Sequence, residues 1–155
     1  MIYFNNDFLI FISSILNFFP ITGSFQANPP DCEELIDVTI THFDKLLENS
    51  NEPLSFILFI HDTPEMNVKI IPRLEGNKFK RTNIVIKSEE HEYRHGFQHL
   101  YHPFDSLTEA TSNTFIYWLQ NDAGFMKWGP MPERMEGLVE SFKKDADREV
   151  LFFYL

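Results

Sequence analysis

The sequence predicts an α/β fold, and three observations carry this prediction. Residues 21–27 form an apolar run that suits a buried strand, residues 31–48 have the periodicity of an amphipathic helix, and residues 54–60 are continuously apolar. The order strand, helix, strand is typical of a crossover between parallel neighbours in one sheet. With 155 residues, 43% of them hydrophobic, the chain suits one packed domain spanning residues 1–155.

The charge balance of the chain is acidic. Lys and Arg number 13 against 23 Asp and Glu, which gives a formal net charge of -10. Such a charge repels nucleic acid unless the basic residues gather locally. The single cysteine, Cys32, excludes an intramolecular disulfide and any zinc site built from several cysteines.

The apolar residues 8–16 have three interpretations that composition does not separate. They suit a buried strand, the apolar part of a signal peptide cleaved near Ala27, or the start of a mis-started or truncated gene product. Only Asp7, and no Lys or Arg, stands before the run, which argues against a signal peptide. The run is too short to span a bilayer, so we expect no membrane partner.

The predicted helix at residues 31–48 has one apolar face. Its apolar side chains recur at helical spacing: Leu35, Ile36, Ile40, Phe43, Leu46 and Leu47. Residues 49–53, which close with Pro53, are expected to end this helix. The apolar run 54–60 then suits a strand buried on both faces.

The middle of the chain is less regular. Residues 61–76 contain prolines and charges and are expected to be irregular, whereas residues 83–87 suit a short β-branched strand. Residues 114–120 predict a stronger strand, followed by a turn at residues 121–124.

A helix and a strand are expected to close the chain. The helix begins at Pro132 and continues to about residue 144, with apolar residues at helical spacing. Residues 149–155 are strand-like. No repeat, low-complexity tract or linker interrupts the chain, which supports a single domain.

A tetrapeptide, Asn28-Pro29-Pro30-Asp31, directly follows the first predicted strand. It is one residue short of the Asn-Pro-Pro-aromatic signature of enzymes that methylate exocyclic amino groups. An Asn side-chain oxygen and a proline carbonyl both accept amino hydrogens, and rigid prolines hold those acceptors in place. Asp31 stands where an aromatic ring normally stacks on the base. The same residues also suit a plain loop before a helix, with Asp31 as its N-cap.

Residues 91–95, His-Glu-Tyr-Arg-His, fit the HExxH pattern of zinc proteases, with Glu109 as a conceivable third ligand. That pattern requires a helix, and Gly96 weakens a helix at the point where it would continue. Arg94 inside the pattern also argues against a helix packed on a sheet. The alternative is that these histidines are surface or loop groups that make hydrogen bonds.

Five of the 13 basic residues gather in one segment of the chain. They are Lys78, Lys80, Arg81, Lys87 and Arg94. Aromatic residues lie between and beside them, so the segment suits phosphates and a stacked base of single-stranded or cap-like RNA. A solvated basic loop that balances an acidic protein explains the same residues.

Short segments found in order from about residue 23 to residue 138 together resemble one known family. They are Ser24-Phe25-Gln26-Ala27-Asn28-Pro29-Pro30, Cys32-Glu33-Glu34-Leu35, Glu52-Pro53-Leu54-Ser55-Phe56-Ile57, Phe79-Lys80-Arg81, His91-Glu92-Tyr93-Arg94, Gln98-His99, Leu119-Gln120-Asn121-Asp122, Gly124-Phe125-x-Lys127-Trp128 and Pro132-Glu133-Arg134. The chain resembles the phosphorylated-CTD-interacting factor family of cap-specific mRNA adenosine N6-methyltransferases. Residues 1–16 and 143–155 are not matched.

The resemblance implies the later part of a Rossmann-like class I methyltransferase core, with a mixed sheet and flanking helices. It implies S-adenosyl-L-methionine as the cofactor, no metal, and a place in the nucleus, with secretion as the alternative if residues 8–16 are a signal segment. The implied substrate is capped RNA, methylated on the N6 amino group of the 2′-O-methyladenosine next to the cap.

The resemblance also implies roles for individual residues. Residues 28–31 match the catalytic motif, in which Asn28, Pro29 and Pro30 hold the N6 amino group. Glu33 is a candidate contact for the cationic methylated guanine, or else a first-turn carboxylate favoured by the helix dipole. The basic candidates for substrate binding are Lys80, Arg81 and Arg94. The cofactor-binding residues are not identified.

Two departures from the family point to weak or absent activity. Asp31 offers no ring, and stacking of a base on an aromatic side chain is worth about 1 to 3 kcal/mol. The early cofactor-binding strands of the family have no match in residues 1–16, which predicts an exposed sheet edge or a partner chain that completes the sheet. The alternative function is a non-catalytic relative or fragment that binds capped RNA or a protein partner. The phosphorylated tail of RNA polymerase II is not an expected partner, because no WW module is visible.

Overall fold

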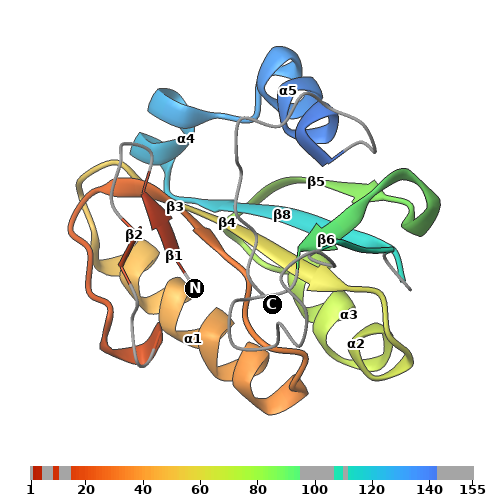
Figure 1. Cartoon of the computed structure of the whole chain (residues 1–155). Helices are drawn as coiled ribbons and strands as arrows, with labels where there is room; N and C mark the ends of the chain where they lie inside the picture. The colour runs from red at the N-terminus through yellow and green to blue at the C-terminus, as the bar shows by residue number, and fades with distance from the viewer. Residues whose placement is uncertain (1, 5–8, 11–14, 95–106, 110–111, 143–155) are drawn as a thin grey trace.

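The predicted α/β architecture is confirmed by a computed structural model, which describes residues 2–4, 9–10, 15–94, 107–109 and 112–142. A mixed six-stranded sheet lies between two layers of helices (Figure 1). Its strands in spatial order are β2 (Leu9–Ile10), β1 (Ile2–Phe4), β3 (Gly23–Ala27), β4 (Leu54–His61), β8 (Thr114–Gln120) and β5 (Lys80–Ile86). Two further strands, β6 (Glu92–Arg94) and β7 (Leu107–Glu109), pair with each other.

The strand directions place the ends of the sheet. β3 and β4 are parallel, and β8 is antiparallel to both β4 and β5, so β5 runs in the direction of β4. Ala27 is opposite Leu58, and His61 is opposite Thr114. We call this the carboxyl end of the sheet. The amino end is the opposite one, where Gly23 is opposite Leu54.

The outer edge of β3 is paired with β1, which runs antiparallel to it. β1 covers residues 25–27 of β3, and the sheet then ends at the two-residue strand β2. The expectation of an exposed sheet edge, or of a partner chain that completes the sheet, stays a prediction. Within the apolar run at residues 8–16, the described residues form the two-residue strand β2 and the beginning of a 3₁₀ turn at Ile15–Asn17.

The larger core lies between the sheet and helices α1 (Glu33–Asn49), α2 (Pro64–Val68) and α3 (Ile70–Glu75). The predicted helix face is confirmed, because α1 buries Ile36, Ile40, Phe43 and Leu47. The ring of Phe43 stacks on Phe56 of β4, with ring centroids 3.9 Å apart. This contact fixes α1 against the strand next to the tetrapeptide.

A smaller core covers the other face of the sheet. Helix α5 (Pro132–Phe142) packs Met135 and Leu138 against a buried cluster of Phe59, Ile86 and Trp118 with Ile116. The predicted helix after Pro132 is therefore confirmed, with its described end at Phe142. The strand expected at residues 149–155 lies outside the described residues.

Residues 61–76 were expected to be irregular, and this prediction is wrong. They hold α2 and α3, which bury Met66, Ile70 and Leu74 at intervals of four residues. The hydroxyl of Thr63 accepts a hydrogen bond from the Met66 N–H at 3.4 Å and caps α2. Burial and this cap compensate for the short length of the helices.

The turn expected at residues 121–124 is also wrong. A helix, α4 (Asp122–Trp128), begins there, and Asn121 is its N-cap. The capping oxygen accepts a hydrogen bond from the Gly124 N–H at 2.8 Å.

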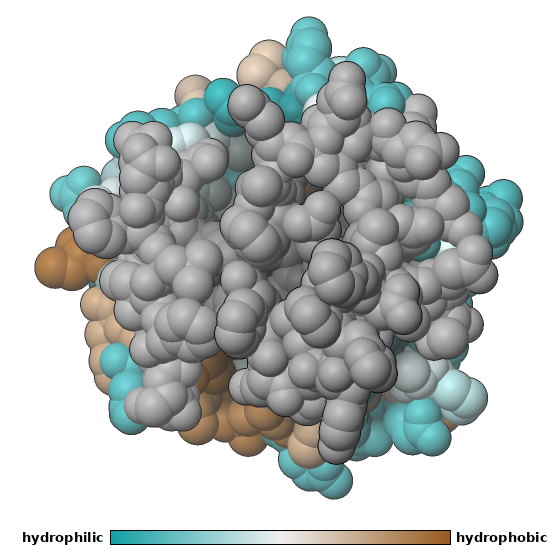
Figure 2. All heavy atoms as spheres, in the orientation of Figure 1, coloured by the Kyte–Doolittle hydropathy of each residue, from teal (hydrophilic) through white to brown (hydrophobic). Residues whose placement is uncertain are grey.

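The described surface is mostly hydrophilic on the face seen in Figure 2, with apolar side chains gathered toward its left and lower parts. Phe19 and Ile21, before β3, are 68% and 74% exposed. Within the described ranges, a search for a helix of sufficient length and apolar character to cross a bilayer finds none.

Candidate functional site

The tetrapeptide lies where the sequence predicts, immediately after β3 at the carboxyl end of the sheet. Pro29 is buried, Asn28 is half-buried, and Pro30 and Asp31 are exposed. A backbone hydrogen bond from the Cys32 N–H to the Pro30 carbonyl, 2.7 Å long, turns the chain toward α1. The motif is therefore anchored on its β3 side and open on its other side.

His61 at the end of β4 contacts the tetrapeptide. Its Nδ1 atom lies 3.1 Å from Oδ2 of Asp31. The side chain of Asp31 is 46% exposed, whereas that of His61 is 13% exposed. Because β3 and β4 are parallel neighbours, the residues that follow the two strands meet at one end of the sheet.

The loops around His61 are tied together by amide side chains. Asp62 accepts hydrogen bonds from Asn67 Nδ2 at 2.6 Å and from Asn113 Nδ2 at 2.9 Å. The side-chain oxygen of Asn113 in turn accepts from the Ser88 N–H at 3.1 Å. These bonds join the loops after β4, before β8 and after β5 into one platform beside the tetrapeptide.

The N-cap of α1 differs from the residue that was predicted for it. The interpretation of Asp31 as N-cap is wrong, because Cys32 occupies that position and makes no side-chain capping bond. The thiol of Cys32 instead donates to Glu34 Oε2 at 3.3 Å. Hydrogen bonds from the Glu34 backbone N–H and from this thiol lower the pKa of Glu34. Asp31 does not cap α1, and its carboxylate contacts His61 instead.

Glu33 stays next to the tetrapeptide, in the first turn of α1. Its Oε1 atom lies 3.0 Å from Lys69 Nζ, and this hydrogen bond raises the pKa of Lys69. The Glu33 carboxylate is also at the positive end of the helix dipole, as one of the two interpretations expected. A cationic base at this position would compete with Lys69.

Lys80 and Arg81 lie at the amino end of the sheet, so the structure does not bring them to the tetrapeptide. Lys80 is opposite Leu119 on β8, whereas His61 is opposite Thr114. At about 3.3 Å per residue, this places the two ends roughly 17 Å apart along the sheet. Arg94 ends β6, outside the main sheet, and its side chain lies outside the described residues.

The basic residues of the predicted cluster that lie at the amino end have acidic partners. Lys80 is paired with Glu75. Arg81 lies 2.6 Å from Asp122, and its Nε donates to the Gln120 carbonyl at 3.1 Å. The guanidinium of Arg81 is also 5.0 Å from the centre of the Phe125 ring. Of the predicted basic cluster, Lys78, Lys80 and Arg81 are thus built into ion pairs rather than gathered as free charge.

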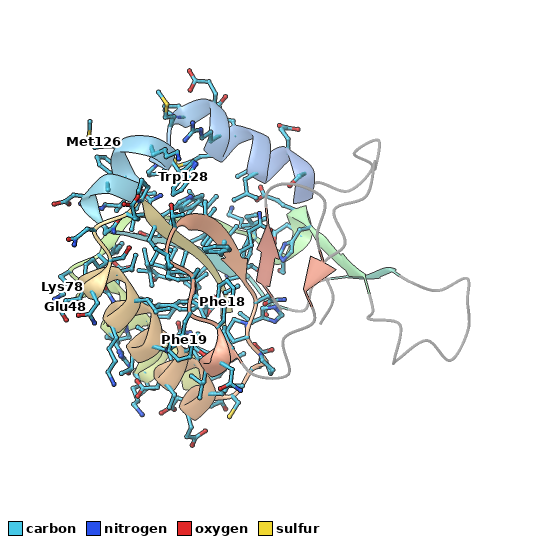
Figure 3. The ribbon with its side chains drawn as sticks, turned by 90° about the vertical axis from the view of Figure 1, so that its left-hand side faces the viewer. Phe18, Phe19, Glu48, Lys78, Met126 and Trp128 are labelled. Carbon is cyan, nitrogen blue, oxygen red and sulfur yellow. The ribbon has the colours of Figure 1, made fainter. Side chains whose placement is uncertain are left out.

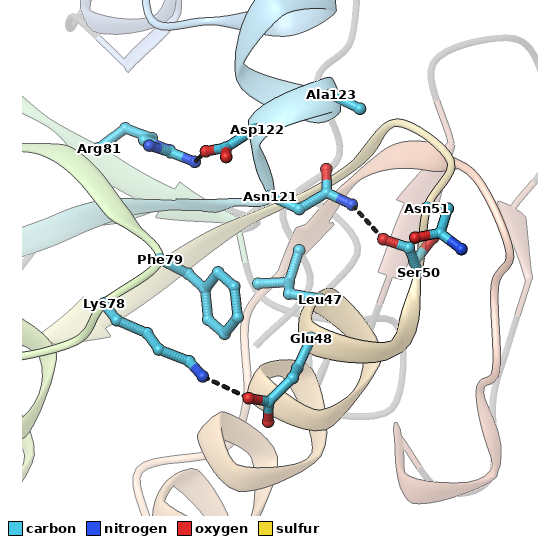
Figure 4. Close-up of a pocket in the computed structure, with 10 residues that line it drawn as sticks. All are labelled: Leu47, Glu48, Ser50, Asn51, Lys78, Phe79, Arg81, Asn121, Asp122 and Ala123. Atoms are coloured by element: carbon cyan, nitrogen blue, oxygen red, sulfur yellow. Dashed lines mark hydrogen bonds and ion pairs between the residues drawn. The ribbon is translucent and has the colours of Figure 1, made fainter.

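A cavity of about 510 Å³ opens at the same end, between the end of α1 and the start of α4 (Figure 4). Lys78 and Glu48 form an ion pair of 2.6 Å on its wall, close together at the molecular surface in Figure 3. Arg81 and Asp122 form the second pair on its wall. Each of the two pairs joins one cation to one carboxylate, so these four side chains give the cavity no net charge.

The HExxH segment is not helical over its described residues. His91 is buried, and residues 92–94 form strand β6. The ring of His91 bonds to the Lys87 carbonyl at 2.7 Å and to the Thr114 hydroxyl at 3.0 Å. His95 lies outside the described residues, among which no group of three potential metal ligands occurs. The zinc-protease alternative lacks the helix that it requires.

His61, Asp62 and Asn113 were missed by sequence reasoning. His61 and Asp62 directly follow a buried strand, which is a usable signal because polar residues at strand ends often belong to sites in α/β sheets. Asn113 carries no comparable signal, since its role depends on where β8 begins.

Comparison with known proteins identifies relatives over most of the chain. The family described as "Phosphorylated CTD interacting factor 1 WW domain" matches residues 9–96. Two curated relatives, each named mRNA (2'-O-methyladenosine-N(6)-)-methyltransferase, are 48% identical in Mus musculus and 46% identical in Homo sapiens over 131 residues. The match covers 84% of this chain and 19% of either relative.

The name of the matched family includes a WW domain, so the expectation that the chain lacks such a module is not supported. The described part of the match carries β3, α1, β4, α2, α3 and β5 of the α/β fold. With more than half of its residues matched, the chain belongs to the phosphorylated CTD interacting factor 1 family.

Proposed function

We propose that this chain carries the amine-binding part of a cap-specific mRNA (2′-O-methyladenosine-N6-)-methyltransferase. The observation that carries the proposal is the place of Asn28, Pro29 and Pro30: they follow β3 at the carboxyl end of the sheet, where open α/β folds bind ligands. The relatives bear the name of this activity, and the chain spans 19% of their length. Capped RNA is accordingly the proposed partner, and the nucleus the proposed location.

In this proposal the tetrapeptide holds and polarises the adenine N6 amino group. The amine is a poor nucleophile, because its lone pair is delocalised into the ring. The side-chain oxygen of Asn28 and the carbonyl of Pro29 accept its two hydrogens and draw electron density onto the nitrogen. Burial of Pro29 keeps its carbonyl in place, which lowers the entropic cost of orienting the amine.

S-adenosyl-L-methionine is the proposed methyl donor, because methyltransferases generally use it. The described residues at the carboxyl end do not themselves fit this cofactor. The loops after β3 and β4 contain no glycine to let the backbone approach it, and the outer neighbour of β3 is the short antiparallel β1. We therefore assign no cofactor-binding residue. We propose that a partner chain, or residues outside the described ranges, supply the cofactor-binding part of the methyltransferase core.

A second candidate function is binding of capped RNA or a protein partner without catalysis. It is favoured by the pairing of Asp31 with His61, since a carboxylate occupies the position of the stacking ring. The two candidates differ in one measurement, which is methyl transfer from S-adenosyl-L-methionine to capped RNA when the upstream, cofactor-binding part of a relative is supplied together with this chain. Product formation supports the first, and RNA binding without product supports the second.

Lys80, Arg81 and Arg94 remain proposed contacts for the RNA backbone rather than for the methylated base. Lys80 and Arg81 are roughly 17 Å from the tetrapeptide along the sheet, a distance that a few nucleotides of single-stranded RNA span. A phosphate would compete there with Glu75 and Asp122.

The amine-binding proposal is tested with the full chain and a labelled, capped RNA that begins with 2′-O-methyladenosine. We expect fluorescence anisotropy to show tighter binding than to the same RNA without a cap. Asn28→Ala is expected to weaken the binding by roughly 3- to 10-fold, the effect of one lost hydrogen bond. Asn17→Ala, an exposed asparagine in the 3₁₀ turn at Ile15–Asn17, is the control. Equal affinities for both RNAs, or for Asn28→Ala and the control, would refute the proposal.

A further inference from the structure

The site as described lacks one component that the proposed reaction needs, which is a flat surface for the adenine ring. Residue 31 is an aspartate, so it supplies none. Phe59, two residues before the end of β4, is 4% exposed and belongs to the buried cluster under α5. It is not accessible to a base.

Among the residues that the structure describes, the imidazole of His61 is a ring that stands beside the tetrapeptide. It reaches the tetrapeptide from β4, the neighbouring parallel strand, and its Nδ1 is 3.1 Å from Asp31 Oδ2. We propose that His61, oriented by Asp31, provides the stacking surface for the substrate adenine. The inference rests on the function proposed above, and it assigns His61 as a substrate-binding residue and Asp31 as the residue that positions it.

The contact with Asp31 explains how one ring is held at this place. The 3.1 Å contact between Nδ1 of His61 and Oδ2 of Asp31 favours the rotamer that turns the ring toward the tetrapeptide. The 13% exposed fraction of His61 shows that most of its side chain is packed while a part stays accessible. A ring held by packing loses less conformational entropy on stacking than a freely rotating one.

The same contact accounts for the negative charge beside the base. An unpaired carboxylate at position 31 would be an unfavourable neighbour for a π face, but Oδ2 is directed to His61. Histidine is among the side chains on which unstacked RNA bases lie. Asp31 and His61 together therefore replace the stacking aromatic residue, and the ring comes from the adjacent strand β4.

The experiment compares two capped RNAs that differ only in their first nucleotide, which is 2′-O-methyladenosine in one and abasic in the other. Fluorescence anisotropy gives the dissociation constants for the full chain. The wild-type protein is expected to prefer the base-bearing RNA by roughly 5- to 150-fold, the range for one stacked base.

Substitutions at His61 separate the effect of the ring's π face from the effect of the side chain's volume. His61→Leu removes the π face and is expected to abolish the preference, whereas His61→Phe keeps a ring and retains it. His42→Ala, a histidine of α1 that contacts the Phe18 carbonyl, is the matched control and leaves the preference unchanged. Thermal melts establish that each variant is folded. If His61→Leu does not fold, the inference is tested with His61→Phe and with the double variant Asp31→Phe, His61→Ala described below.

A rescue variant tests the shared role of the two residues. Placing a ring at the family position in a chain without the imidazole, as Asp31→Phe combined with His61→Ala, is expected to restore the preference. The inference is overturned if His61→Leu keeps the preference, or if either ring-bearing variant lacks it. A wild-type chain that prefers capped over uncapped RNA but ignores the missing base also overturns it, and leaves the proposed function standing. A chain that binds neither RNA overturns both.

Discussion

The side-chain oxygen of Asn121 accepts a hydrogen bond of 3.1 Å from the backbone N–H of Leu54, so the N-cap of α4 also holds the first residue of β4. The same oxygen caps Gly124, and the amide nitrogen donates to the carbonyls of Ser50 and Glu52 at 3.0 and 2.9 Å. This single side chain joins the end of α1, the start of β4 and the start of α4.

Asn121→Ala is expected to lower the free energy of unfolding by about 2 to 4 kcal/mol. The change removes a helix cap and leaves buried backbone groups without partners. Urea denaturation measures the effect, with Asn51→Ala as a control expected to stay within about 0.5 kcal/mol of wild type. A similar stability of the two variants would show that the network does not hold these elements together.

Gly124→Ala is expected to be strongly destabilising, by about 3 kcal/mol. An added Cβ would lie 2.1 Å from the Leu54 carbonyl oxygen, so α4 and β4 would have to separate. Gly137 in α5 is the matched control, because an added Cβ meets nothing within 4 Å. Gly137→Ala is expected to stabilise the protein by about 0.5 to 1 kcal/mol through helix propensity. Opposite signs in urea denaturation confirm this, and equal signs contradict it.

Glu75 is expected to make stability depend on pH in the acidic range. The hydrogen bond from Lys80 lowers the pKa of Glu75 below 4.5, and a bond of 2.8 Å from the buried Tyr117 hydroxyl adds to this. A lowered folded-state pKa means that the stabilisation is present above the unfolded value near 4.5 and is lost as the pH falls through the folded value. Burial and Glu75 also raise the pKa of Tyr117, which stays protonated throughout.

The measurement for Glu75 is urea denaturation of Glu75→Gln at about pH 7 and about pH 3. We expect the variant to lose stability relative to wild type at the higher pH and to approach it at the lower one. Glu65→Gln, an exposed carboxylate on α2, controls for the change in net charge. A gap between Glu75→Gln and wild type that is the same at both pH values would contradict the assignment.

Lys80→Ala combined with Arg81→Ala is expected to weaken binding of capped RNA uniformly, whatever the first nucleotide. If both residues contact phosphates, the slope of log affinity against log salt falls by about 1 per contact. The matched control is Lys45→Ala, an exposed lysine on α1. An unchanged slope would mean that the ion pairs with Glu75 and Asp122 are structural and that RNA passes elsewhere.

The elements with strong periodicity are the ones that could be predicted from the sequence. The runs that become β4 and β8 and the apolar face of α1 depend on local hydrophobic pattern, and the structure has them within a residue or two of the expected bounds. The short helices between residues 61 and 76 and after Asn121 were missed. Their stability comes from buried contacts with distant residues, which a local pattern does not contain.

By itself, the sequence determined the family, the α/β class and the place of the tetrapeptide after a strand, because motif order and hydrophobic period are local properties. Only the tertiary structure decided which side chains share an end of the sheet. Asp31 meets His61 because β3 and β4 are parallel, and Lys80 and Arg81 lie at the far end because β8 is inserted antiparallel between β4 and β5. Strand order and register arise from packing between residues far apart in the chain, so they emerge only in the folded protein.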